Sequence, residues 1–413
     1  MSIALLDGQI IDGVGNDPIE RGGILVEDNR ITYVGKMVNF TVPKDAERID
    51  LGGRTVMPGL IDAHVHLVNT GDPDPMKRLK TSPAQSTIQA VVHAKKALMA
   101  GITTVRDLGA FGGGIDFALR DSVNAGIIPG PRMKVAGRSL TITGGHSDPK
   151  NGFPPGFPVA DTYGFSVTVD TPEEARRAAR IELRRGADCI KFCATGGILS
   201  AGTDNRAVGL SRADMAAAVE EAKNRGKRTA AHAQGTEGIK NALAAGVDSI
   251  EHGTWFDEEA IEMLIARGAY LVPTLTAGSK IRKMGTAAGI PEEAVKKAKA
   301  DPNAGVESLM GVYQAGGKIA MGTDAGVPYN FHGANGGELP LMVEAGMTPM
   351  DVLMAATCHG AELIGFDTGQ LVPGKLADMI VTDGDPLIEI ERMAEPDYVV
   401  LVMKDGTLFK NSL

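Results

Sequence analysis

The stretch that decides the fold is residues 228–274, RTAAHAQGTEGIKNALAAGVDSIEHGTWFDEEAIEMLIARGAYLVPT. Short apolar runs alternate here with longer segments whose apolar residues recur at helical spacing. We predict strands at Arg228–Ala233, Ser249–His252 and Tyr270–Thr274, and helices at Thr236–Ala245 and Asp257–Arg267. Strands that alternate with helices in this way are typical of parallel βαβ units.

The same alternation extends in both directions from this stretch. Further strands are predicted at Val56–Leu67, Ile102–Leu108, Met133–Leu140, Cys189–Ala194 and Lys318–Met321. Further helices are predicted at Ser86–Ala100, Pro172–Arg185 (with Thr171 as N-cap), Arg212–Arg225, Pro291–Ala315 and Pro349–Gly360. Eight strands, each followed by a helix or a long loop, favour an α/β fold with a (β/α)8 TIM-type barrel over residues 57–365. An open doubly wound sheet is the alternative.

Both ends of the chain have a different pattern. They contain short β-like runs at Ile3–Leu6, Gly23–Glu27, Arg30–Val34, Met379–Thr382, Tyr398–Met403 and Thr407–Phe409. Asp28-Asn29 and Lys404-Asp405-Gly406 have the composition of tight hairpin turns. We therefore predict one small β-sandwich domain built from residues 1–56 and 366–413.

Composition excludes several classes of partner. The 413-residue chain has a net charge of −9 and no basic stripe, which argues against binding to nucleic acid or to a membrane surface. No apolar run reaches the roughly 18 residues of a membrane span. Three cysteines, Cys189, Cys193 and Cys358, are too few for a disulfide framework and favour a reducing compartment. We expect a cytoplasmic protein whose partner is a small molecule.

Lys191 is unusual because it interrupts the apolar run Cys189–Ala194. A lone cation in a buried strand costs several kcal/mol of desolvation unless it is paired or neutralised. Five more polar residues follow or end strand-like runs: His64, His66, His232, His252 and Asp324. Catalytic groups of a barrel gather at the carboxyl ends of its strands, and residues two apart share one strand face. The joint pattern indicates a metal site in which Lys191 is modified into a ligand, whereas a structural role would require a separate partner for each buried group.

Several motifs resemble one family. Residues 58–66 (PGLIDAHVH), 143–146 (TGGH), 251–253 (EHG), 322–326 (GTDAG) and 373–379 (PGKLADM) are similar to the binuclear-zinc branch of the amidohydrolase superfamily. Within that branch, the sequence looks most like the Xaa-Pro dipeptidase (prolidase) and imidazolonepropionase-related group. The resemblance covers almost the whole chain. It implies that Lys191 is carboxylated to N6-carboxylysine and that two divalent metal ions, zinc by preference, share its carbamate oxygens.

The resemblance also implies roles for the remaining residues. His64, His66 and Asp324 would hold the first metal and His232 and His252 the second, each together with Lys191. A hydroxide bridging the metals would attack the substrate carbonyl, because two metals lower the pKa of water toward 7. Asp324 would pass its proton to the leaving nitrogen, and His146 would hydrogen-bond the carbonyl oxygen.

The implied reaction is hydrolysis of an amide bond, in an Xaa-Pro-type dipeptide or an N-acyl amino acid. Alternatives are a cyclic amide of the imidazolone type, a carbamate or a xenobiotic amide, and a non-catalytic scaffold. A one-metal deaminase is disfavoured because it does not need the strand lysine. By resemblance we also expect a homo-oligomer.

Substrate contacts are predicted less directly. Gln234 occupies the position where some dipeptidases of the group carry a tyrosine, Arg206 is a candidate for binding a substrate carboxylate, and Tyr329 and His332 follow Asp324 in a long loop. A solvated loop position is the alternative for each of the last three. Asp62 shares a strand face with His64 and is a candidate to orient it.

Overall fold

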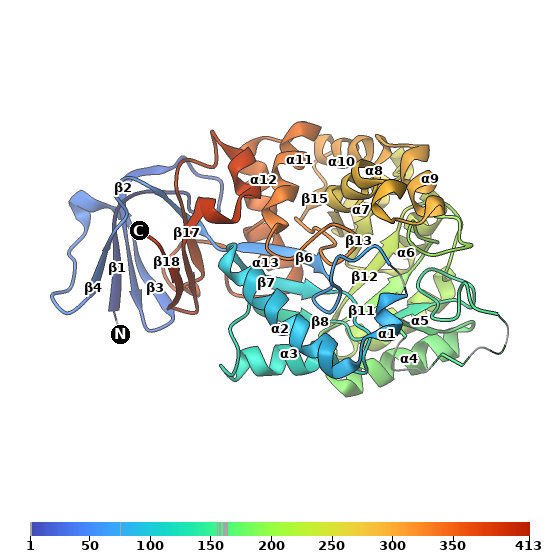
Figure 1. The fold of residues 1–413 in the computed structure, drawn as a ribbon. Helices are drawn as coiled ribbons and strands as arrows, with labels where there is room; N and C mark the ends of the chain where they lie inside the picture. The colour runs from blue at the N-terminus through green and yellow to red at the C-terminus, as the bar shows by residue number, and fades with distance from the viewer. Residues whose placement is uncertain (1, 75, 155, 157, 160–163) are drawn as a thin grey trace.

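The computed structural model describes residues 2–74, 76–154, 156, 158–159 and 164–413. A mixed sheet built from both chain ends lies beside a larger α/β region (Figure 1). Its strand order is β18-β17-β16-β5-β1-β2-β3, and β4 pairs with β1. The strands are β1 (Ser2–Ile10), β2 (Ile19–Glu27), β3 (Arg30–Lys36), β4 (Glu47–Asp50), β5 (Thr55–Pro58), β16 (Met379–Thr382), β17 (Val399–Lys404) and β18 (Thr407–Asn411).

Hairpin turns close two strand pairs of the mixed sheet where the sequence predicts them. Glu27 pairs with Arg30 across Asp28-Asn29, and Asp28 has φ of 53°. At the other end, Asp405 and Gly406 have φ of 56° and 72°, as tight hairpin turns require. The two ends of the chain meet where β5 pairs antiparallel with β16.

The α/β region contains two parallel sheets. One has the order β6-β7-β8 and the other β10-β9-β11-β12-β13-β14-β15. The strands are β6 (Leu60–Val65), β7 (Ile102–Asp107), β8 (Arg132–Val135), β9 (Ser139–Thr141), β10 (Ser166–Thr168), β11 (Cys189–Cys193), β12 (Arg228–Ala233), β13 (Ser249–His252), β14 (Tyr270–Val272) and β15 (Lys318–Ile319). Parallel sheets fit the predicted α/β class.

Backbone hydrogen bonds connect the two parallel sheets at both ends. The amide of Asp188, just before β11, donates to the carbonyl of Val135 on β8 at 2.8 Å. The amide of Ala63 on β6 donates to Met321, just after β15, at 2.9 Å. These bonds bring the first and last strands of the α/β region together.

Helices follow most of the parallel strands. They are α1 (Lys77–Lys80), α2 (Pro83–Met99), α3 (Ile115–Asn124), α4 (Pro172–Arg185), α5 (Arg212–Lys223), α6 (Thr236–Ala245), α7 (Glu258–Arg267), α8 (Leu275–Met284), α9 (Glu292–Ala300), α10 (Ala304–Gln314), α11 (Glu338–Ala345), α12 (Pro349–Ala355) and α13 (Cys358–Ile364). Thr171 caps α4 as predicted, because its side chain accepts from the amide of Glu174. Helices α3, α8 and α11 were not predicted.

Four predicted elements are divided in the structure. The expected strand Val56–Leu67 breaks at Gly59, where a Cβ atom would lie 2.2 Å from Thr103 Oγ1. The expected strand Met133–Leu140 becomes β8 and β9, which belong to different sheets and are separated by Gly137 at φ of 72°.

Two helices are divided in the same way. Pro291–Ala315 becomes α9 and α10, because Pro302 lacks the N–H that a helix interior needs. Pro349–Gly360 becomes α12 and α13 because Thr357 leaves helical geometry, at φ of −133° and ψ of −93°.

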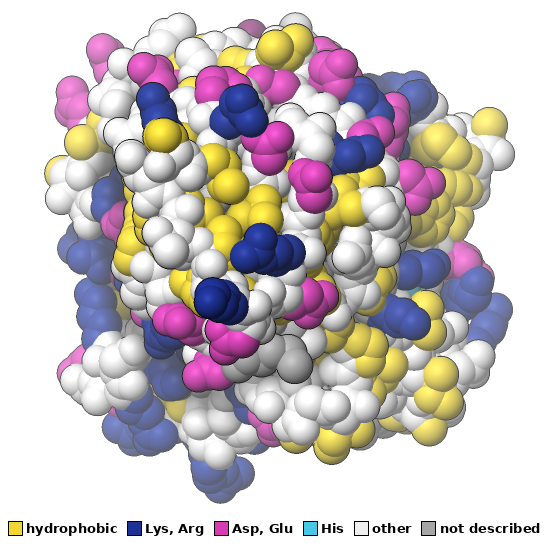
Figure 2. All heavy atoms as spheres, turned by 90° about the vertical axis from the view of Figure 1, so that its left-hand side faces the viewer, with side chains coloured by type: hydrophobic (Ala, Val, Ile, Leu, Met, Phe, Trp, Pro, Cys, Tyr) yellow, Lys and Arg dark blue, Asp and Glu magenta, His cyan; other side chains and the backbone are white. Residues whose placement is uncertain are grey.

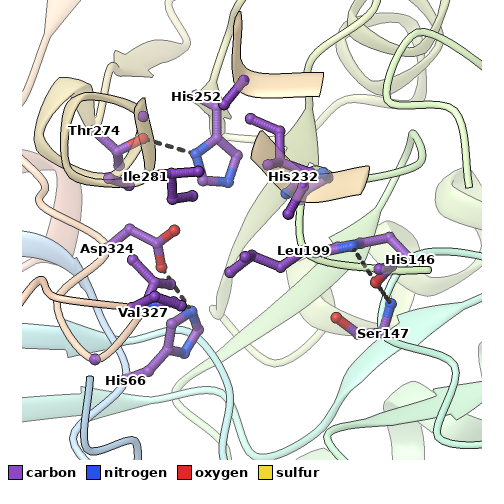
Figure 3. Close-up of a pocket in the computed structure, with 18 of the residues that line it drawn as sticks. His66, His146, Ser147, Leu199, His232, His252, Thr274, Ile281, Asp324 and Val327 are labelled. Carbon is purple, nitrogen blue, oxygen red and sulfur yellow. Dashed lines mark hydrogen bonds and ion pairs between the residues drawn. The ribbon is translucent and has the colours of Figure 1, made fainter. Parts of the chain in front are cut away.

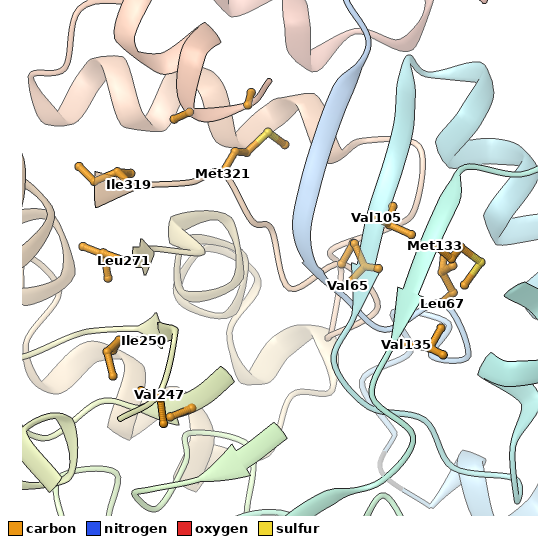
Figure 4. Close-up of a cluster of buried hydrophobic side chains, with 14 of the residues drawn as sticks. Val65, Leu67, Val105, Met133, Val135, Val247, Ile250, Leu271, Ile319 and Met321 are labelled. Carbon is orange, nitrogen blue, oxygen red and sulfur yellow. The ribbon is translucent and has the colours of Figure 1, made fainter. Parts of the chain in front are cut away.

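Apolar side chains anchor the parallel strands (Figure 4). Val65, Val105 and Met133 come from the β6-β7-β8 sheet, and Ile250 and Leu271 come from β13 and β14. All five are at most 2% exposed. Because this packing is dense, the polar residues at the strand ends stand on a rigid base.

The surface of the mixed sheet carries interspersed acidic and basic side chains on the face that Figure 2 shows. Such a mixture forms no single-sign field of the kind that nucleic acids attract. Among the described residues, no helix has both the length and the apolar character needed to span a lipid bilayer. The three cysteines form no disulfide.

Candidate active site

Six polar side chains from separate strands gather at one place. Lys191 lies on β11, His232 on β12, His252 at the end of β13 and His64 on β6, while His66 and Asp324 follow β6 and β15. Ring centroids lie 5.1 Å apart for His64 and His252 and 4.6 Å apart for His232 and His252. Figure 3 shows the His232–His252 pair facing the His66–Asp324 pair across a common space. The structure thus brings together every residue that the sequence selected as a metal ligand.

Asp324 lies between two histidines. Its Oδ1 is 3.2 Å from His66 Nε2 and 3.6 Å from His64 Nε2, without a well-aligned hydrogen bond to either. Ligand atoms of these three residues all lie within 4.8 Å of one another. Asp324 and His252 adopt left-handed backbone conformations, with φ of 58° and 71°. Such strain costs of order 1–3 kcal/mol per residue and clusters at functional sites.

One nitrogen of each histidine is held by the protein. The contacts are His64 Nδ1 to Glu251 Oε2 (2.9 Å), His66 Nδ1 to the Gly109 carbonyl (3.0 Å), His232 Nε2 to the Gly196 carbonyl (2.9 Å) and His252 Nδ1 to Thr274 Oγ1 (2.7 Å). This arrangement orients each ring and leaves its second nitrogen available as a ligand.

The imidazoles of this cluster differ in their tendency to protonate. Burial, together with the charge of Lys191, lowers the pKa of His64, His232 and His252 well below the usual value, so these rings are neutral. Burial also opposes charge at His66, but Asp324 outweighs it and raises the pKa. A neutral imidazole is the form that binds metal ions.

Lys191 is 4% exposed, and its Nζ has no hydrogen-bond partner in the described structure. Burial lowers the pKa of this amine, although Glu251 opposes the shift. Buried polar atoms nearly always have a partner. Lys191 Nζ and Asp324 Oδ1 are two unpartnered buried atoms beside a histidine cluster, and this is what a site for divalent cations leaves when only protein atoms are counted.

A buried ion-pair network supports His64, and the sequence analysis missed it. Glu251 is 0% exposed and accepts from His64, from Ser249 Oγ at 2.5 Å and from Arg106 Nη2 at 2.8 Å. Arg106 also donates to the carbonyl of Ala63 at 2.7 Å. The signal was present, because both charges interrupt apolar strands just as Lys191 does. Their partners could not be read from a single strand.

Asp62 has a different role from the predicted one. Its carboxylate accepts from the backbone amide of His64 (3.1 Å), from Thr323 Oγ1 (2.6 Å) and from Asn335 Nδ2 (2.8 Å). It therefore ties β6 to the segment that carries Asp324, whereas Glu251 contacts the His64 ring.

His146 reaches the cluster from the loop after β9. Its ring stacks on His232 with centroids 4.1 Å apart, and its Nδ1 lies 2.8 Å from Ser200 Oγ. A Cβ on Gly197 would lie 2.1 Å from that nitrogen, so this glycine allows the close approach. Burial, with a contribution from Lys191, lowers the pKa of His146 to about 3, and the ring is neutral.

A cavity of about 860 Å³ opens onto the cluster. Leu199, Ile281 and Val327 project into it (Figure 3). Gln234 lines it as predicted, and its Oε1 accepts from Asn205 Nδ2 at 2.9 Å.

The other three candidate substrate contacts lie outside the cavity wall. Arg206 is exposed, 3.4 Å from Asp301 and over the ring of Trp255. The Tyr329 hydroxyl donates to the carbonyl of Ala288, and His332 Nε2 lies 3.1 Å from the carbonyl of Asn69. Loop packing, which the sequence does not reveal, directs these side chains elsewhere.

Residues 55–409 match the amidohydrolase family. The chain is similar to ochratoxinase of Aspergillus niger, with 32% identity over 428 positions that cover 98% of this chain and 85% of the relative. It is also similar to imidazolonepropionase of Paracoccus denitrificans, with 25% identity and 88% of each chain covered. Among solved structures, a Xaa-Pro dipeptidase with bound methionine in the active site matches with a TM-score of 0.91, 36% identity and full coverage of both chains.

These likenesses agree with the strand-end cluster and with the motifs in the sequence. Amidohydrolases usually bind divalent metals, and the His64–His66–Asp324 group has donors of the right kind. The relatives are enzymes that hydrolyse C–N bonds. The chain is a hydrolase acting on C–N bonds and belongs to the amidohydrolase family.

Proposed function

We propose that this protein hydrolyses the amide bond of a dipeptide, of Xaa-Pro type, or of an N-acyl amino acid, with two divalent metal ions in the strand-end cluster. His64, His66 and Asp324 would hold one ion, His232 and His252 the other, and Lys191 both, as an N6-carboxylysine. The observation that carries the proposal is the pair of unpartnered buried atoms, Lys191 Nζ and Asp324 Oδ1, among histidines whose outer nitrogens are already engaged.

When bound, such ions polarise the carbonyl of the substrate and make water a strong nucleophile at neutral pH. The protein supplies the remaining steps. Asp324 accepts the proton of the attacking water and delivers it to the leaving nitrogen. His146, whose neutral ring is fixed by Ser200, donates a hydrogen bond to the carbonyl oxygen as negative charge develops there. Leu199, Ile281 and Val327 keep bulk water away from the reacting groups.

A second candidate substrate is a larger amide, such as a cyclic amide, a carbamate or a xenobiotic amide. The observation in its favour is the cavity, whose volume of about 860 Å³ lies near the upper end of the usual range for small-molecule sites. A dipeptide would leave much of this space to water.

We propose in addition that the parallel strands close into a (β/α)8 barrel over residues 57–365, and that residues 1–56 and 366–413 form the small β-sandwich domain. The hydrogen bonds from Asp188 to Val135 and from Ala63 to Met321 support closure. Zinc as the metal, a cytoplasmic location and a homo-oligomeric state stay predictions of the sequence.

Metal analysis and a substrate screen test the proposed function. We expect two divalent ions per chain in the wild type and fewer, with loss of activity, in Lys191→Ala. Short carboxylic acids should restore activity to Lys191→Ala, because they replace the missing carbamate. Xaa-Pro and other dipeptides, N-acyl amino acids and ring amides would be assayed with zinc, manganese or cobalt. Unchanged metal content and activity in Lys191→Ala would refute the two-metal site, and absence of metal and activity in the wild type would favour a scaffold.

A further inference from the structure

We propose that Arg282 binds a carboxylate of the substrate, which makes the site selective for amides that carry a free acid group. This inference rests on the proposed function, because it names the substrate class within it. It replaces the sequence-based assignment of carboxylate binding to Arg206.

The charges in the cavity wall single out Arg282. The described lysines and arginines that line the cavity are Lys77, Lys191, Arg282 and Lys297. Lys77 pairs with Asp72, and Lys297 pairs with Glu293 at 2.7 Å. Outside the strand-end cluster, Arg282 is thus the cation of this set with no carboxylate within ion-pair distance. Burial lowers the pKa of its guanidinium, and no acidic neighbour offsets the shift.

The position of Arg282 is set by helix α8. This helix begins directly after Thr274, whose hydroxyl lies 2.7 Å from Nδ1 of His252. Side chains on a helix point back toward its N-terminus. The Arg282 guanidinium accordingly lies beside Gly278, with Nη1 3.0 Å from the place of a Cβ there. Four residues of helix correspond to about 6 Å along the axis from Thr274, which is within one amino-acid residue and one hydrogen bond of the reacting centre.

The chemistry of an arginine suits this role. A guanidinium stays charged and presents a planar fork that matches a carboxylate with two parallel hydrogen bonds. Lys297 is less suited, because its Nζ already donates to the carbonyl of Ser200 at 2.9 Å. Arg206 is excluded by its place outside the wall, where Asp301 neutralises it. Ile281 beside Arg282 gives the charged end an apolar neighbour, which strengthens the ion pair.

The test compares one acid with its neutral ester. N-Benzoyl-L-methionine and its methyl ester share the scissile amide, and the ester lacks the charge. We expect the metal-loaded wild type to prefer the acid, and Arg282→Ala to lose on the order of 10- to 100-fold in kcat/KM for the acid, mainly through KM, with little change for the ester. Arg282→Lys should recover part of the loss, because it keeps the charge without the fork.

Lys283→Ala is the matched control, because it removes one positive charge from the same helix at an exposed position outside the cavity wall. It should behave like the wild type. Equal ratios of acid to ester turnover in the wild type and Arg282→Ala would overturn the inference while leaving the proposed function intact.

A binding measurement separates the two claims. Calorimetry with the metal-loaded enzyme would compare L-methionine with L-methioninamide. We expect L-methionine to bind on the order of 10-fold more weakly to Arg282→Ala than to the wild type, and L-methioninamide to bind both equally. If no amide is hydrolysed, the proposed function fails, and L-methionine binding still decides on Arg282. Equal L-methionine affinity in both proteins would refute its role.

Discussion

Arg106→Met is the sharpest test of the network behind the strand-end cluster. Arg106 and Glu251 have side chains 2% and 0% exposed and lie 2.8 Å apart. Methionine has a similar apolar stem and removes only the charge and its donors. Breaking one partner of a buried ion pair leaves an uncompensated charge and costs about 3–5 kcal/mol. We expect a loss of that size in the free energy of unfolding, measured by urea titration with circular dichroism.

A second effect should appear at the metal site. Glu251 holds Nδ1 of His64, and loss of such outer partners typically reduces metal affinity about 10- to 100-fold. The double variant Arg106→Met/Glu251→Leu should be more stable than Arg106→Met alone, because it also removes the unpaired carboxylate.

The control for this prediction is Arg138→Met. Arg138 also contacts a buried acid, Glu182, but it is 21% exposed and Arg185 contacts the same carboxylate at 2.8 Å. Its loss should cost no more than about 1 kcal/mol. A loss below about 1 kcal/mol in Arg106→Met, equal to that of the control, would refute the reasoning.

The remaining predictions concern one catalytic contact and one surface cluster. Gly197→Ala places a Cβ against the His146 ring, and we expect kcat to fall on the order of 100-fold with metal content unchanged, as measured by steady-state kinetics and metal analysis; an unchanged kcat would remove His146 from the mechanism. Hydrogen bonds from Arg180 and Arg176 lower the pKa of Glu221 from 4.5 to about 2. A lowered carboxyl pKa stabilises the folded state above the unfolded-state pKa and stops doing so as pH falls through the folded-state pKa. The urea midpoint of Glu221→Gln should therefore lie below that of the wild type at pH 7, and the difference should vanish between pH 4.5 and 2; a constant difference would show that the charge is irrelevant.

Local patterns in the sequence were sufficient for the order of elements and for the members of the cluster. The alternation over residues 228–274 predicted β12 and β13 and helix α6 to the residue, because hydrophobic periodicity and caps act within one element. His64, Lys191 and Asp324 could be selected for the same reason. Parallel strands end at a common edge, and a charged or metal-binding side chain in an apolar run is conspicuous.

Tertiary structure decided everything that depends on two segments meeting. Thr103 breaks the expected long strand at Gly59, and Arg106 reaches Glu251 across 145 positions of sequence. The same holds for the carboxylate site. Arg206 and Arg282 are both arginines in the sequence, and only packing places one against Asp301 and the other in the cavity wall. Such contacts have no period or spacing in the sequence, because they are determined by the shapes and charges of surfaces that fold together.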